Sequence, residues 1–300
     1  MATTVSDVLF GRLLKSHQYI LWASPSAQPD VGGNEPVFAF DCEELLNPDI
    51  CVPSASRHVC VSLEVNSLPL TAIIHSRDIE DAFTSLAPTS SVVRLDLLNL
   101  NIAKGLIPLA STLVDETSFC LEPFKILTYL AENWANDALK NANTFADSLQ
   151  MNLYRWINNR KSLFFAPALQ RHVHKIVCKA FGVLVGKLRQ LGAEVLQANL
   201  HTMILSTKKV SVDQAQGYCD YLMQAIHEVP CMKYLVLQPT HFWSRLVFLD
   251  GYNYAGLKMV EQGRAMDVSV VEDSGNRAID GMEASQRWDF ADHLPRKSWI

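Results

Sequence analysis

The 300-residue sequence lacks the features that mark several special classes of protein. Glycine and proline are scarce, with 13 of each, which excludes collagen-like and low-complexity architectures. No apolar run approaches the roughly 18 residues that a membrane-spanning helix needs. The net charge of −5 argues against a uniformly basic nucleic-acid-binding protein, but it does not exclude local basic patches. With 49% hydrophobic residues, the chain suits one large globular domain or two small ones.

Paired cysteines and a signal peptide are also missing. The seven cysteines are odd in number and include no Cys-x-x-Cys pair, which argues against a disulfide framework and a zinc ribbon. Residues 1–24 carry Asp7, Arg12, Lys15 and His17 among their apolar positions, so no signal peptide is predicted. We therefore expect an intracellular protein whose cysteines are mostly reduced, with several of them buried.

Hydrophobic periodicity predicts both strands and helices. Apolar residues alternate from Val59 to Val65, which predicts a strand with one buried face. Apolar residues recur at steps of three and four from Pro167 to Gln190, which predicts the clearest helix. In chain order, the predicted elements are a short strand around 37–40, a strand over 59–66, helices over 122–141 and 167–190, two strands around a turn over 193–207, a helix from 211, and strands over 234–237 and 242–249.

This order of elements predicts an α+β fold, with an antiparallel sheet and helices packed on one face. Residues 1–58 are expected to be an irregular segment that leads into the sheet, and residues 59–258 are expected to hold the sheet and its helices. Residues 259–300 are expected to be a linker and a partly disordered tail, because charge and glycine rise there while aromatic residues vanish between 260 and 285. The predicted core residues are Val61, Leu63, Val173, Val177, Phe181, Leu184, Val195, Leu222, Val236 and Val247.

The common enzymatic signatures are absent from the sequence. It contains no Gly-x-x-x-x-Gly-Lys, Gly-x-Gly-x-x-Gly, His-Glu-x-x-His or Gly-x-Ser-x-Gly. His172 and His174 are two residues apart on the predicted helix, so their side chains diverge by about 200° and cannot chelate one metal together. We expect them to be solvated or partly packed, and we predict no metal site.

Two short stretches can be compared with metal-dependent phosphoryl transfer. That chemistry uses carboxylates on adjacent strands to hold two Mg²⁺ ions, which take oxygen ligands. The first stretch is Leu63-Glu64-Val-Asn-Ser67-Leu68-Pro69, and the second is the predicted turn Ala198-Asn199-Leu200-His201-Thr202.

Several segments in a fixed order between residues 18 and 258 carry a resemblance to a known family. They are Ile20-Leu-Trp-Ala-Ser-Pro, Pro29-Asp-Val-Gly-Gly, Val59-Cys-Val-Ser-Leu-Glu-Val, Tyr154-Arg-Trp, Pro167-Ala-Leu-Gln-Arg, Leu191-Gly-Ala-Glu-Val, Ala198-Asn-Leu-His-Thr-Met-Ile-Leu-Ser-Thr-Lys-Lys and Asn253-Tyr-Ala-Gly. Through them the sequence resembles the carboxy-terminal half of DNA polymerase epsilon catalytic subunits, which is a catalytically degenerate copy of a B-family polymerase. The resemblance implies a palm-like antiparallel sheet with fingers-like helices over 59–258.

The resemblance also implies that the catalytic motifs are degenerate here. The first palm motif of active B-family enzymes, Asp-x-x-Ser-Leu-Tyr-Pro-Ser, reads Glu64-Val-Asn-Ser-Leu-Pro-Leu, so one carboxylate survives and the tyrosine is lost. The second motif, Asp-Thr-Asp on a hairpin turn, reads Asn199-Leu-His201, and the Lys-Lys-x-Tyr motif reads Gly251-Tyr-Asn-Tyr254. A neutral amide and an imidazole cannot balance two Mg²⁺ ions beside a triphosphate.

The function implied by the resemblance is structural. It is that of a non-catalytic segment of the polymerase catalytic subunit, which supports holoenzyme assembly and docking to the replicative helicase during chromosomal DNA replication in the nucleus. The other polymerase subunits and the helicase complex are the implied partners, with no membrane. No cofactor is expected in this segment. The Mg²⁺, and the zinc or iron–sulfur cluster, of the whole subunit belong to regions outside this chain, as does the DNA-directed DNA polymerase (nucleotidyltransferase) activity.

Two alternatives stay open. One is a residual DNA-binding module, which would use Lys175, Lys179, Lys208 and Lys209 together with Arg171; ordinary solvated surface charge explains the same residues. The other is a cryptic polymerase or nuclease, which would use Glu64 with further acids that the sequence does not identify. We favour the simpler interpretation, in which Glu64 is an inherited acid that no longer has a catalytic task.

Overall fold

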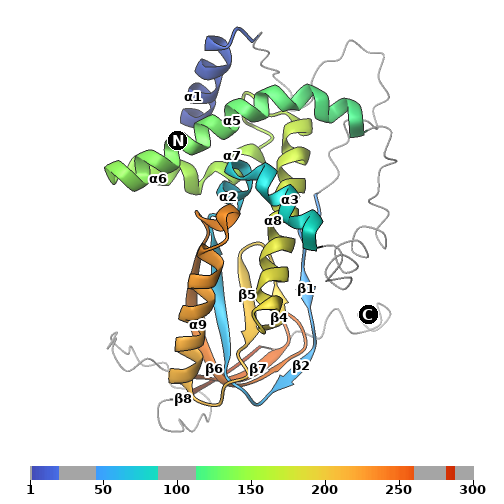
Figure 1. The fold of residues 1–300 in the computed structure, drawn as a ribbon, viewed down its shortest axis with the longest axis vertical. Helices are drawn as coiled ribbons and strands as arrows, with labels where there is room; N and C mark the ends of the chain where they lie inside the picture. Colours follow the sequence, from blue (N-terminus) through green and yellow to red (C-terminus); the bar gives the residue numbers. More distant parts are fainter. Residues whose placement is uncertain (1, 20–44, 87–112, 260–281, 288–300) are drawn as a thin grey trace, which may run out of the picture. The chain divides into compact units, whose positions relative to one another are not determined.

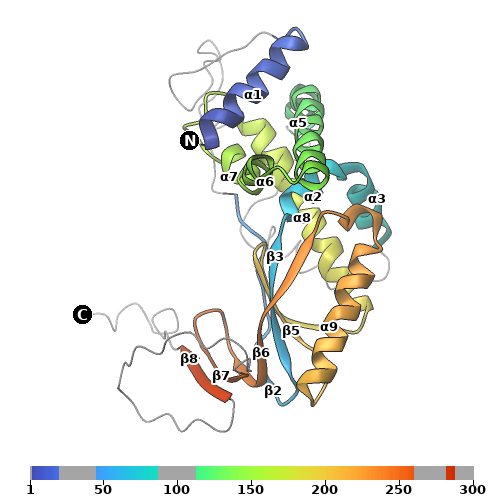
Figure 2. The same ribbon diagram turned by 90° about the vertical axis from the view of Figure 1, so that its left-hand side faces the viewer.

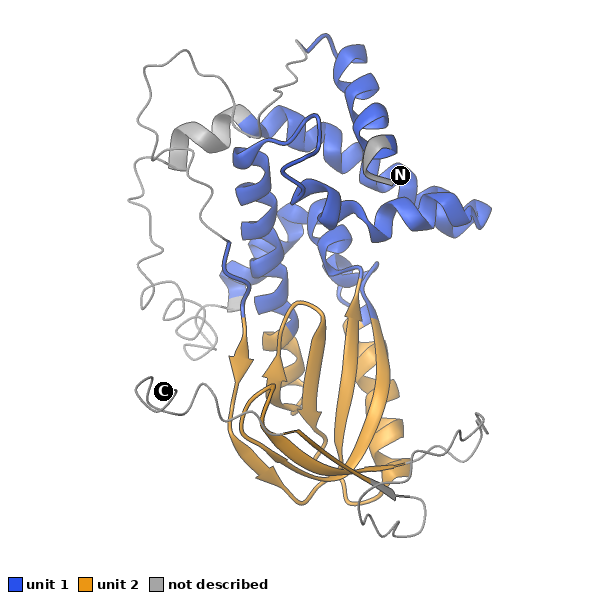
Figure 3. Ribbon diagram, turned by 180° about the vertical axis from the view of Figure 1, so that it is seen from behind, with its two compact units in different colours: residues 1–48, 67–184, 227–236 blue, residues 49–66, 185–226, 237–300 orange. Residues whose placement is uncertain are grey.

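The computed structural model describes residues 2–19, 45–86, 113–259 and 282–287 (Figure 1). The chain forms two compact units, each assembled from separate stretches of sequence (Figure 3). Unit 1 comprises residues 1–48, 67–184 and 227–236, and unit 2 comprises residues 49–66, 185–226 and 237–300.

Unit 1 is helical in its described part. Its elements are α1 (Ala2–Ser16), α2 (Leu68–Ile74), α3 (Ser76–Leu86), α5 (Leu113–Asn141), α6 (Thr144–Met151), α7 (Leu153–Ile157), α8 (Pro167–Gln190) as far as Leu184, and the short 3-10 helix η2 (Pro230–Met232). Local chemistry fixes several helix ends. Pro69 lies in the first turn of α2, where its missing N–H costs nothing. The Asn143 side chain caps α6 by accepting bonds from the N–H groups of Phe145 and Ala146.

Unit 2 is built around a sheet with the strand order β1-β4-β5-β3-β6-β7-β8, in which β2 also pairs with β6. Its strands are β1 (Ile50–Cys51), β2 (Ser54–Ser56), β3 (Cys60–Asn66), β4 (Glu194–Ala198), β5 (Thr202–Ser206), β6 (Val236–Phe248), β7 (Tyr254–Met259) and β8 (Met282–Arg287). The pairs β3–β5, β4–β5, β6–β7 and β7–β8 are antiparallel. Helix α9 (Val212–His227) lies along the sheet (Figure 2) and buries Ala215, Cys219, Leu222 and Ile226.

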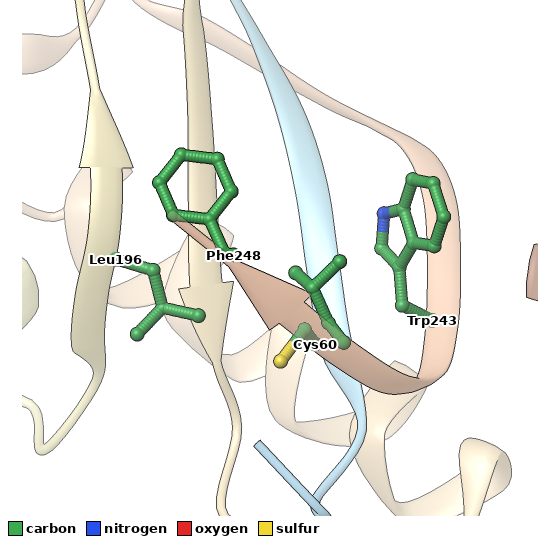
Figure 4. Close-up of a cluster of buried hydrophobic side chains, with 5 residues drawn as sticks. Cys60, Leu196, Trp243 and Phe248 are labelled. Carbon is green, nitrogen blue, oxygen red and sulfur yellow. The ribbon is translucent and has the colours of Figure 1, made fainter. Parts of the chain in front are cut away.

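A buried hydrophobic cluster joins three strands of the sheet. Cys60 of β3, Leu196 of β4 and Trp243, Leu246 and Phe248 of β6 pack together (Figure 4). The indole Nε1 of Trp243 donates a hydrogen bond to Ser62 Oγ at 2.9 Å, so the one polar atom of this ring is satisfied. The cluster therefore ties β6 to β3 through both apolar packing and a side-chain hydrogen bond.

The α+β prediction is confirmed, and the helix over 167–190 and the hairpin over 193–207 lie where the sequence placed them. Eight of the ten predicted core residues are buried, but Val236 and Val247 are wrong, because they are 41% and 53% exposed. The two strands predicted over 234–249 form one strand, β6, and its pairing with β7 shifts register between Trp243 and Arg245. This shift turns Leu246 and Phe248 inward and Val247 outward.

Two segments that were expected to be irregular contain regular structure. Residues 1–58 include α1, β1 and β2, and residues 259–300 include β8. The buried face of α1 carries Ser6 and Asp7 beside Phe10 and Leu14, so its apolar pattern is weak. β8 has few apolar residues and is a strand through its backbone pairing with β7.

Other expectations are resolved only in part. The short strand around 37–40, the linker over 260–281, the tail from 288 and Cys42 lie outside the described residues. The division of the chain at residues 58 and 258 stays a prediction.

The six described cysteines are free thiols, and four of them are buried, as expected. Across the described ranges, no helix combines the length and the apolar character that crossing a membrane requires.

Candidate functional site: Glu64 and the turn between β4 and β5

The structure brings the two stretches that resemble polymerase motifs together in unit 2. Strand β3 pairs with β5 so that Glu64 lies opposite Thr202. The backbone N–H of Val65 donates to the carbonyl oxygen of His201 at 2.7 Å. Glu64 therefore lies beside the β4–β5 turn that carries Asn199 and His201, and its side chain is exposed.

The Asn199 side chain organises this turn. Its Oδ1 accepts hydrogen bonds from the N–H of His201 at 2.9 Å, the N–H of Thr202 at 2.7 Å and the hydroxyl of Thr202 at 3.2 Å. Its backbone N–H donates to the carbonyl oxygen of Thr202 at 2.9 Å. This is an Asx-type turn, in which a short polar side chain mimics a backbone turn. The amide oxygen of Asn199 is therefore committed to the fold.

This site has few side chains that could act in catalysis or bind a metal ion. Glu64 provides one carboxylate, His201 provides an exposed imidazole, and Leu200 between the two turn residues is buried. Within the described ranges, no group of three or more His, Cys, Asp or Glu residues could hold a metal ion.

The Gly251–Tyr254 stretch, which the resemblance aligns with the Lys-Lys-x-Tyr motif, spans the turn between β6 and β7. Asp250 Oδ1 accepts hydrogen bonds from the N–H groups of Tyr252 at 2.7 Å and Asn253 at 2.8 Å. Asn253 is buried and its amide also bonds to the Asp250 carboxylate. This stretch therefore belongs to a turn with its own internal hydrogen bonds.

The four candidate lysines belong to different units. In unit 1, Lys175 is exposed, whereas Lys179 Nζ pairs with Glu80 Oε1 at 2.5 Å. In unit 2, Lys208 is exposed and Lys209 Nζ lies 5.7 Å from the centre of the Tyr218 ring. Arg171 of unit 1 is partly buried. DNA binding through these residues stays a prediction.

Comparison with known proteins identifies the family. A family model described as "Domain of unknown function (DUF1744)" matches residues 1–257. The chain belongs to this family.

Its curated relatives are much longer proteins. A DNA polymerase epsilon catalytic subunit of Arabidopsis thaliana is 28% identical over 297 residues, which cover 98% of this chain and 13% of the relative. The corresponding protein of Debaryomyces hansenii is 32% identical over 251 residues, or 83% of this chain and 11% of the relative. The corresponding protein of Saccharomyces cerevisiae is 29% identical over 266 residues, which cover 86% of this chain and 11% of the relative. The resemblance to the C-terminal part of these proteins is confirmed, and the chain spans only a small fraction of their length.

One polar cluster in this DUF1744 chain was missed by the sequence reasoning. His174 of α8 is 7% exposed; its Nδ1 is 2.8 Å from the Tyr154 hydroxyl and its Nε2 is 3.0 Å from the carbonyl oxygen of Leu46. Cys178, one helical turn later, has its Sγ 3.4 Å from the same Nε2. A neutral ring that donates from Nε2 to Leu46 and accepts at Nδ1 from Tyr154 satisfies both contacts. The sequence signal was the i, i+4 spacing of His174 and Cys178.

Burial sets the charge state of this cluster. It lowers the pKa of His174, and the hydrogen bond to Leu46 only partly opposes this. Burial also raises the pKa of Tyr154 to about 12 and the pKa of Cys178 to about 12. All three groups are therefore neutral at pH 7, which suits a structural tie between α7, α8 and the chain before β1.

This cluster predicts a loss of stability in mild acid. Below the ordinary histidine pKa of 6.5, the unfolded chain binds a proton that folded His174 does not bind. The free energy of unfolding should therefore fall as the pH drops from 6.5 toward the folded pKa, by at most about 1.4 kcal/mol per pH unit for this residue. Urea unfolding at a series of pH values measures the slope.

His174→Gln should reduce that slope, whereas Phe145→Leu, which changes an exposed ring that does not titrate, should leave it at the wild-type value. His172, whose pKa burial also lowers, contributes in the same direction in all three proteins. A slope that His174→Gln leaves unchanged would contradict the assignment.

Proposed function

We propose that this chain is a non-catalytic structural segment of a DNA polymerase epsilon catalytic subunit and that it acts in chromosomal DNA replication in the nucleus. The proposal includes its origin as a degenerate B-family palm. Its role is to support assembly with the other polymerase subunits and docking of the replicative helicase complex. The similarity to these catalytic subunits over most of the chain supports the replication setting.

The single observation that carries the non-catalytic part is the hydrogen bonding of Asn199. Two-metal nucleotidyl transfer needs carboxylates that bridge the metal ions. At the β4–β5 turn, the Asn199 oxygen already accepts three bonds from the turn itself, and the other polar side chains there are those of His201 and Thr202. Glu64 alone supplies a carboxylate, which is too little negative charge for two Mg²⁺ ions and a triphosphate.

The experiment that tests this function compares two substitutions in the complete catalytic subunit. Glu64→Gln should leave both primer extension and co-purification of the other subunits unchanged. Phe181→Ala, which removes a fully buried side chain of α8, should lower the recovery of the assembled complex. A tenfold or larger loss of primer extension by Glu64→Gln would reject the non-catalytic role, and full recovery of the complex with Phe181→Ala would reject the assembly role.

Restoring the missing acids should create a cation site at the turn. In the variant Asn199→Asp/His201→Asp, the new carboxylate at position 199 can still accept the bonds that shape the turn, and Glu64 lies beside it. We expect the variant to bind Mn²⁺ at least tenfold more tightly than the wild-type chain, because two further carboxylates then lie on the turn beside Glu64. Calorimetric titration with Mn²⁺ measures this.

Adding Glu64→Gln to the double variant serves as the control, and it should remove most of the gain. If the double variant binds Mn²⁺ no more tightly than the wild-type chain, the turn is not a vestigial metal site.

A further inference from the structure

In unit 2, residues on and beside β2, β6, β7 and β8 line a groove of about 460 Å³. Figure 2 shows how these four strands lie. The strand registers place its residues side by side: Ala55 lies opposite Val247, and Val247 lies opposite Ala255. Arg245, two residues before Val247, lies opposite Leu257. The side chains of Arg245 and Val247 therefore point away from the buried cluster formed by Leu246 and Phe248.

The floor of the groove is apolar. Val247 is 53% exposed, and Leu257 and Ala255 are partly exposed beside it. Ala55 on the neighbouring strand is also exposed. Small side chains let another element approach a sheet closely, and sheets commonly bury such a face under a helix.

Two arginines at the groove have no ion pair among the described residues. Ser56 pairs with Leu246, so Arg57 and Arg245, the next residues along the two antiparallel strands, are neighbours. Neither arginine forms an ion pair or a ring contact with the described residues, and both are exposed. Two nearby cations, in contrast, contact aromatic rings. Lys258 Nζ lies 5.3 Å from the centre of the Trp243 ring, and the guanidinium of Arg287 lies 5.0 Å from the centre of the Tyr252 ring. Like charges on adjacent strands repel each other unless an anion compensates them.

We propose that this groove binds an amphipathic helix of a partner protein, with an Asp or Glu beside the apolar stripe of that helix. The carboxylate would pair with the guanidinium groups of Arg57 and Arg245, whose planar geometry matches it. The apolar stripe would cover Val247 and Leu257. This deepens the proposed assembly role and rests on it, because it assigns the surface through which a partner attaches.

The groove favours a protein over a nucleic acid. None of the described residues that line it is aromatic, so it offers no ring on which a base could stack. Two arginines would neutralise only two phosphates, and nucleic-acid affinity comes mainly from many such contacts. Its apolar floor suits leucine or methionine side chains instead.

The test measures binding of defined peptides to the complete chain by fluorescence anisotropy. The probes are a fluorescein-labelled helix of four Glu-Ala-Leu-Leu repeats and its counterpart with lysine in place of glutamate. The acidic probe should bind saturably, and the charge-reversed variant Arg57→Glu/Arg245→Glu should bind it at least tenfold more weakly. The same variant should gain affinity for the lysine probe, which also shows that it is folded.

The matched control is Arg155→Glu/Lys161→Glu, which reverses two exposed charges of unit 1. It should leave binding of the acidic probe unchanged. Equal binding of the acidic probe to the wild-type chain and the charge-reversed groove variant would overturn the proposal. So would saturable binding of a 12-nucleotide thymidine strand that the groove substitutions abolish, together with no binding of the acidic probe. The acidic probe could bind the wild-type chain and the groove variant equally while Phe181→Ala still disrupts the complex. That outcome would reject only the groove proposal and would leave the assembly role in place.

Discussion

Phe181→Ala is expected to lower the free energy of unfolding of the chain by about 3–5 kcal/mol. Phe181 is among the largest fully buried side chains and lies in the middle of α8, where Val177 and Leu184 on the same helix are also fully buried. Truncating the ring removes its apolar contacts and leaves a cavity that the packed helices fill only in part. Urea unfolding followed by circular dichroism measures the change.

The control for this substitution is Phe145→Ala. Phe145 is also a helical phenylalanine of unit 1, but it is 56% exposed, so its removal should cost about 0.5 kcal/mol or less. The assignment of Phe181 to the core is wrong if the two substitutions have similar effects.

Asp7→Ala is expected to cost about 2–5 kcal/mol, although it removes only a small polar side chain. Asp7 of α1 is 4% exposed and accepts a hydrogen bond from Trp156 Nε1 at 2.9 Å. It also accepts bonds from the Ser162 hydroxyl and, at 3.4 Å, from the N–H of Leu163. Alanine would leave these donors without their acceptor, and buried unpaired donors are costly. Chemical unfolding of wild type and variant gives the difference.

A double-mutant cycle with Trp156→Phe isolates the main bond. Phenylalanine keeps an aromatic ring near Phe10, whose ring centre lies 5.4 Å from that of Trp156, but it lacks the N–H donor. In the Asp7→Ala background, Trp156→Phe should therefore cost about 1–2 kcal/mol less than in the wild type. Strict additivity of the two substitutions would show that the Asp7–Trp156 bond contributes nothing to stability.

The elements that sequence reasoning found correctly are those set by local pattern. The helix over 167–190 repeats apolar residues at helical spacing along its whole length, begins at a proline and is followed by Gly192, whose φ of 90° suits glycine. The hairpin over 193–207 follows from a short polar turn between two apolar runs. The same kind of pattern was too weak in α1, whose buried face includes Ser6 and Asp7.

The order of residues along the chain was enough to establish the α+β class, the long helix and the hairpin. The buried face of β6 became known only from the folded chain, because a shift of one residue in a strand exchanges its two faces without changing its composition. The same holds for the burial of Asp7 beside Trp156 and for the use of the Asn199 oxygen by its own turn. Arg57 and Arg245 lie far apart in the chain and become neighbours only through the pairing of β2 with β6. Contacts between distant segments depend on how strands pair and helices pack, and no local periodicity encodes them.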